Sequence, residues 1–192
     1  MRSLSLCCSS FRIEGNLTHQ IAEKTFPALV ELGTSIANNL TPDNADCLHL
    51  ILKTYKASTQ ISLSPHQQSP QSIIPWGRLF FQVVNVQLPH GIILPGDKDE
   101  WEKSEWWKAK KWAYNTLNRL FQRYGNPSQL PNSMKKDIKA FSEHFVTSFA
   151  PEIFKIYLNQ VELYVKKESW LSNKCLSAII MFFTSWWVSL FQ

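Results

Sequence analysis

Apolar residues recur every three or four positions along almost the whole 192-residue chain. This spacing is typical of amphipathic helices, which bury one face against their neighbours. The pattern is clearest between residues 106 and 124, where the charged side chains lie largely away from the apolar stripe. The stripe consists of Trp106, Ala109, Ala113, Leu117, Leu120 and Tyr124. Because no convincing alternating pattern of β-strands appears, the sequence predicts an all-α protein.

Several helix boundaries are marked by local signals. Thr41 precedes Pro42 and Ser69 precedes Pro70, and each pair places a capping residue before a proline at the first helical position. Gly125 is expected to end the clearest helix. In the first half of the chain we expect helices at 17–38, with a bend or restart at Pro27, from Pro42 onward, and at about 71–86. In the second half we expect helices at 106–124, from Asn132 onward with a kink or restart at Pro151, and from Ser169 or Trp170 onward. Val83 and Val84 are compatible with a short strand, but the preceding spacing favours helix, and residues 63–70 are expected to be a polar connector.

The expected helices group into pairs of about 45 to 50 residues, which is near the length of HEAT-type repeats. We therefore expect an α-solenoid of about three HEAT or armadillo-type helix pairs. Because the pairs share little sequence, a non-repetitive helical bundle remains an alternative. The predicted organisation is an unplaced segment at 1–15, a repeat segment at 16–184 with pairs at about 17–62, 71–125 and 132–184, and an atypical apolar tail at 185–192.

Composition and motifs exclude several classes of protein. Hydrophobic residues make up 44% of the chain, so it is not a disordered polar sequence, and the net charge of +5 is too small to indicate nucleic-acid binding by itself. The five histidines are scattered without metal-ligand spacing, and the four cysteines form no CxxC motif. The segment 91–96 lacks the features of a phosphate-binding loop. We expect no catalytic, cofactor-binding or metal-binding residues, and therefore no enzyme.

The segment 105–112 is unusual because it combines three tryptophans with three lysines. Such residues can bind acidic peptides or single-stranded nucleic acid through charge and stacking. Helical spacing favours a simpler interpretation, in which Trp106 joins the core, the lysines face water, and Trp107 or Trp112 packs on a neighbouring helix. The candidate partner-binding residues are Trp107, Lys108, Lys110, Lys111 and Trp112.

The end of the chain is apolar. Residues 175–192 are an uncharged run of 18 residues, preceded by Lys166, Lys167 and Lys174. This length is at the lower limit for a membrane-spanning helix, so a tail-anchored membrane protein is an alternative. A buried helix accounts for the same run, which also contains several serines and a threonine.

Three segments resemble one known family. They are Leu50–Lys56, Pro75–Phe80 and the long segment from Trp106 to Pro127, which has the pattern W-W-K-x-K-K-W-A followed by L-x-R-L-F-x-R-Y-G. These segments are similar to the importin-β superfamily of nuclear transport receptors, and most similar to its importin seven and eight branch, including the fungal members. The similarity extends from about Asn16 to Thr184.

The resemblance implies a function and partners. Members of this family are α-solenoids, not enzymes, whose inner surface holds protein cargo and the GTPase Ran and whose outer grooves contact phenylalanine-glycine nucleoporins. We therefore expect a Ran-dependent nuclear import receptor that moves between cytoplasm and nucleus, and no small-molecule substrate or cofactor.

The resemblance also implies that the chain is a fragment from the N-terminal third of a longer receptor. The main Ran-contacting repeats would precede Met1 and most of the solenoid would follow Gln192, as in a truncated or mispredicted gene product. Residues 175–184 would then be half of a repeat, with an exposed apolar face. The alternatives from other classes are the tail-anchored protein and a single-stranded nucleic-acid binder that uses the tryptophans and lysines.

Overall fold

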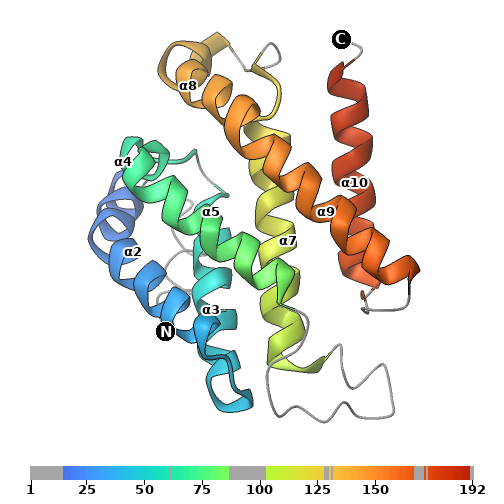
Figure 1. Cartoon of the computed structure of the whole chain (residues 1–192). Coiled ribbons are helices and arrows are strands. Elements are labelled where there is room, and N and C mark those ends of the chain that lie inside the picture. The colour runs from blue at the N-terminus through green and yellow to red at the C-terminus, as the bar shows by residue number, and fades with distance from the viewer. Residues whose placement is uncertain are drawn as a thin grey trace. The chain divides into compact units, whose positions relative to one another are not determined.

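The computed structural model describes residues 15–60, 62–86, 103–127, 130, 132–166, 171 and 173–190, without the side chains of 15–18, 132–137 and 188–190. Within these residues all regular structure is helical (Figure 1), which confirms the all-α, HEAT-like prediction. The elements are α2 (Gly15–Asn38), α3 (Pro42–Ser58), α4 (Pro65–Gln68), α5 (Pro70–Asn85), α7 (Glu105–Tyr124), α8 (Asn132–His144), the π-helical turn η2 (Phe145–Phe149), α9 (Ala150–Val165) and α10 (Asn173–Leu190).

The predicted helix starts agree with the structure. Helix α3 begins at Pro42 with Thr41 as its N-cap, and the backbone N–H of Thr41 donates to Oδ1 of Asn44 at 2.8 Å. Helix α5 begins at Pro70 with Ser69 as its N-cap. Val83 and Val84 are fully buried within α5, so the alternative of a short strand is wrong. The predicted start of the last helix at residue 169 or 170 lies outside the described residues.

The connector predicted at 63–70 contains one further helical turn, α4. Its cap is reciprocal, because the backbone N–H of Gln67 donates to Oγ of Ser64 at 3.2 Å and the N–H of Ser64 donates to Oε1 of Gln67 at 3.0 Å. Such a capping box satisfies two backbone donors at once. The side chain of Gln67 is also buried and donates to Oγ of Ser58 at 3.0 Å, which ties this turn to the end of α3.

The chain divides into two compact units, residues 1–113 and 114–192, with the boundary inside α7. In the first unit α2 packs against both α3 and α5. Four aromatic side chains from these three helices form its centre: Phe26, Tyr55, Trp76 and Phe80, each exposed by 1% or less. The ring centroids of Tyr55 and Trp76 lie 4.4 Å apart, those of Tyr55 and Phe80 5.1 Å, and those of Phe26 and Trp76 5.4 Å. Rings at these separations add attraction between their faces and edges to the area that they bury.

A single glycine permits the close packing of α2 on its neighbours. A Cβ atom on Gly33 would lie 2.8 Å from Cδ2 of Leu79 on α5 and 3.4 Å from Cγ2 of Ile51 on α3. Because core side chains already occupy the space beside Gly33, any larger residue at this position must displace them. The close approach of α2 to α3 and α5 therefore requires glycine at position 33.

We expect Gly33→Val to lower the free energy of unfolding by about 1 to 3 kcal/mol, because it overpacks the contact of α2 with α3 and α5. Urea denaturation followed by circular dichroism would measure the change. The control is Ser35→Val, which places the same side chain on the exposed face of α2 and should change stability by less than about 0.5 kcal/mol. Equal losses in the two variants would contradict the role of Gly33 in packing.

In the second unit a proline is accommodated by a π-helical turn. Residues 132–165 are continuously helical, but Pro151 has no N–H to donate to the carbonyl four residues earlier. The turn η2 precedes it, and the N–H of Ala150 donates to the carbonyl of Phe145, five residues back. A π-helical turn is one of the known ways in which a helix absorbs such a defect. The irregularity predicted at Pro151 is therefore present just before it.

Helix α10 packs through aromatic side chains on α7 and α9. Phe182 is 1% exposed, and its ring centroid lies 4.7 Å from Phe121 and 5.0 Å from Tyr157. The helix continues without a break through residue 184 to Leu190, and Trp186 stacks on Phe121 at 5.5 Å. The residues predicted as an atypical tail are thus helical as far as Leu190, and Trp186 contributes to this packing.

The other side of α10 is apolar and exposed. Ile180, Met181 and Trp187 are 63%, 52% and 65% exposed. No helix among the described residues has both the length and the apolar character needed to cross a membrane.

Candidate functional site

The tryptophan- and lysine-rich segment lies in the first half of α7, and its apolar stripe is buried as predicted. All six stripe positions, from Trp106 to Tyr124, are 2% exposed or less. Trp107 is also buried, at 5% exposed, and its backbone N–H lies 3.4 Å from Oγ of Ser104. The stripe therefore positions the remaining side chains of the segment at its borders.

Lys110 does not face water, contrary to the simpler interpretation of the sequence. Its side chain is 1% exposed, and Nζ donates to the carbonyl of Val86 at 3.0 Å. The ammonium group also lies 5.3 Å from the ring centroid of Trp107 and 5.9 Å from that of Trp106. A hydrogen bond and two aromatic rings together offset part of the cost of removing this charge from water. Lys110 therefore links α7 to the C-terminal end of α5.

Three of the five candidate partner-binding residues reach the surface. Lys108 is 39% exposed along its side chain and pairs with Glu105, while Lys111 and Trp112 are half-buried. The ammonium group of Lys111 lies 5.3 Å from the ring centroid of Trp112. Trp107 and Lys110 are instead part of the interior, so any surface contact made by this segment depends on Lys108, Lys111 and Trp112.

We expect Lys110→Ala to lower the free energy of unfolding by about 1.5 to 3 kcal/mol, because it removes a charged hydrogen bond and leaves the carbonyl of Val86 without this donor. Lys111→Ala, on the next residue, should cost less than about 1 kcal/mol. Chemical denaturation of both variants would measure the difference. If the two costs were the same, Lys110 would not have the structural role that its contacts imply.

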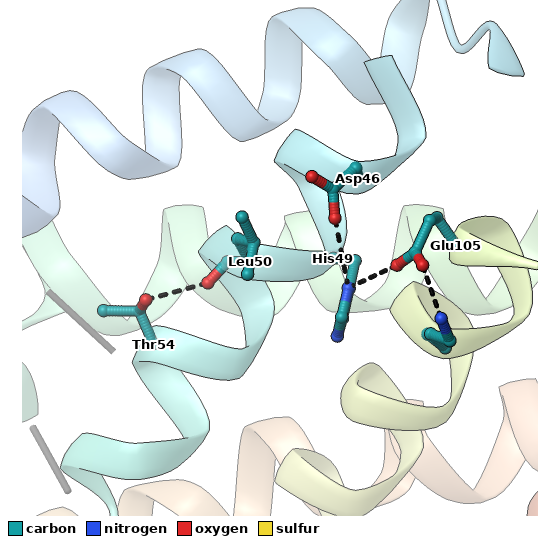
Figure 2. A network of polar contacts seen from close by, with 6 residues as sticks. Asp46, His49, Leu50, Thr54 and Glu105 are labelled. Atoms are coloured by element: carbon teal, nitrogen blue, oxygen red, sulfur yellow. Dashed lines mark hydrogen bonds and ion pairs between the residues drawn. The ribbon is translucent and has the colours of Figure 1, made fainter. Parts of the chain in front are cut away.

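A cluster of polar side chains joins α3 to the first turn of α7 (Figure 2). Nδ1 of His49 lies 2.7 Å from Oε2 of Glu105 and 3.7 Å from Oδ1 of Asp46. The other oxygen of Glu105, Oε1, accepts a hydrogen bond from Nζ of Lys108. The side chain of His49 is 12% exposed, that of Glu105 34% and that of Asp46 52%, so the cluster extends from the interior to the surface.

Burial and charge determine the protonation of this cluster. Burial lowers the pKa of His49 below its ordinary value of 6.5, and the charges of Glu105 and Asp46 only partly offset this effect. Burial acts to raise the pKa of Glu105, but the hydrogen bond from Lys108 and the charge of His49 outweigh it, so this pKa lies below its ordinary value of 4.5. At neutral pH the cluster therefore presents an uncharged imidazole beside a charged carboxylate.

This cluster was not predicted from the sequence. Asp46 and His49 are three residues apart on one helix, which is a spacing that brings side chains together and is visible in the sequence. Glu105 comes from a distant segment, and only the packing of the helices brings it to His49. The segment between α5 and α7, which includes residues 91–96, is largely outside the described residues.

The sequence is similar to several known proteins, some of which are named as importins. The chain is 32% identical over 166 residues to nonsense-mediated mRNA decay protein 5 of Saccharomyces cerevisiae, covering 82% of this chain and 15% of that protein. It is 32% identical over 118 residues to importin-8 of Mus musculus, covering 62% of this chain and 11% of that protein. It is 27% identical over 170 residues to an importin β-like SAD2 homolog of Arabidopsis thaliana, covering 87% of this chain and 16% of that protein.

The chain is a relative of the importin-β family. It spans between a tenth and a sixth of the length of these curated relatives. No family model matches it, and no solved structure matches it significantly. The similarity to importins confirms the family resemblance that the sequence motifs indicate.

Proposed function

We propose that this chain forms part of a HEAT-type receptor that carries protein cargo between cytoplasm and nucleus. The observation that supports this most strongly is the identity of 27 to 32% to importin-like proteins over 118 to 170 residues. Packed pairs of helices are the architecture by which such solenoids present extended binding surfaces. On this proposal the chain acts by binding and not by catalysis, and Ran and phenylalanine-glycine nucleoporins are partners of the receptor.

Within this proposal the surface part of the tryptophan- and lysine-rich segment contacts a partner. Lys108, Lys111 and Trp112 combine positive charge with an aromatic face and lie next to one another on α7. A partner that complements them would carry acidic side chains, since charge complementarity governs both orientation and association rate. Trp107 and Lys110 support this surface from inside.

We expect the full chain, fused to a fluorescent reporter too large to diffuse through nuclear pores, to accumulate in nuclei of permeabilised cells supplied with Ran and GTP. The double variant Lys108→Glu and Lys111→Glu should reduce accumulation at least twofold, because it reverses the charge of the proposed contact. Quantitative fluorescence microscopy would measure the nuclear-to-cytoplasmic ratio.

The matched control reverses two exposed lysines of the second unit, Lys139→Glu and Lys155→Glu, and should leave accumulation unchanged. A fusion excluded from nuclei like the reporter alone would contradict nuclear entry by this part of the receptor. Accumulation that the two double variants reduced equally would refute the partner contact but not transport.

A further inference from the structure

Three side chains from two helices direct metal-ligating atoms at one point. Asp46 and His49 on α3 and Glu105 on α7 each offer one ligand atom, and these atoms all lie within 4.8 Å of one another (Figure 2). Nδ1 of His49 is central, because both carboxylates face it. We propose that this cluster is a binding site for a divalent transition-metal ion, with Zn²⁺ as the best match.

The separations of the ligand atoms suit a small coordination sphere. In a tetrahedral Zn²⁺ site with bonds of about 2.0 to 2.2 Å, neighbouring ligand atoms lie roughly 3.3 Å apart. The distances from Nδ1 of His49 to Oε2 of Glu105 and to Oδ1 of Asp46, 2.7 and 3.7 Å, lie on either side of that value. Oδ1 of Asp46 and Oε2 of Glu105 lie within 4.8 Å of each other, so side-chain rotations that bring these two oxygens closer together would admit the ion, and water would complete its coordination.

Burial gives a second reason for a ligand at this cluster. Nδ1 of His49 and Oε2 of Glu105 are both buried, and neither makes a well-directed hydrogen bond, although they are in close contact. A buried polar atom without a satisfactory partner is costly, and coordination to a metal ion would satisfy both atoms at once.

The chemistry of the ligands selects the class of metal. One imidazole nitrogen and two carboxylates suit Zn²⁺ and neighbouring transition metals, whereas Ca²⁺ and Mg²⁺ prefer oxygen ligands alone. Lys108 holds the second oxygen of Glu105, which fixes this carboxylate with Oε2 toward His49. Ligating carboxylates in metal sites are commonly oriented by such outer hydrogen bonds.

The test is a titration of the full chain with Co²⁺, followed by visible absorption, and a competition with Zn²⁺. We expect one saturable site with the weak bands of nitrogen and oxygen ligands, and displacement of Co²⁺ by Zn²⁺. His49→Gln and Glu105→Gln should each weaken binding at least tenfold, and Asp46→Asn should weaken it measurably. Bound Zn²⁺ should also raise the melting temperature, because it binds the folded chain.

The matched control is Asp43→Asn, which removes the same charge from the exposed first turn of α3 outside the cluster and should leave affinity unchanged. Circular dichroism would show that the variants fold. If Glu105→Gln unfolded, the exposed Asp46→Asn would provide the comparison. The proposal is overturned if the wild type binds no more tightly than the His49→Gln variant, or if the Co²⁺ complex shows the intense band of a thiolate ligand.

Discussion

The contact of Phe26, Tyr55, Trp76 and Phe80 determines the arrangement of the first unit. These rings come from three helices, and the centroids of the rings in contact lie 4.4 to 5.9 Å apart. Because these large rings are closely packed, a shift of α2, α3 or α5 alone would open a gap or cause a clash in the core. Gly33 complements this cluster, because the absence of a side chain at this position lets the backbone of α2 come close to Leu79 of α5 and Ile51 of α3.

The polar cluster depends on the same packing. Helix α3 directs Leu48, Leu52 and Tyr55 into the core, and this rotation places Asp46 and His49 at the border of its buried face. Helix α7 has its own buried stripe, which fixes the rotation of Glu105 in its first turn. The approach of His49 to Glu105 is therefore a consequence of two apolar faces. A carboxylate in this first turn is further favoured by the partial positive charge of the helix N-terminus.

Local signals were sufficient to predict most helices, but not the environment of individual polar residues. The stripe of α7 and the starts at Thr41 and Ser69 follow from spacing and capping, which depend on neighbouring residues only. The burial of Lys110 and the pairing of His49 with Glu105 depend on segments that are distant in sequence. Helical spacing shows that Lys110 borders the stripe, but not that the carbonyl of Val86 lies within its reach.

The proposed metal site and the proposed partner surface share Lys108 and are electrostatically coupled. Without metal, the carboxylates of Asp46 and Glu105 outweigh the ammonium group of Lys108, so the cluster is net negative at neutral pH. A divalent cation would make the same cluster net positive and would weaken the attraction of Glu105 for Lys108. Lys108 and Lys111 would then present an uncompensated positive surface on α7. An acidic partner would therefore bind more tightly when the metal is present.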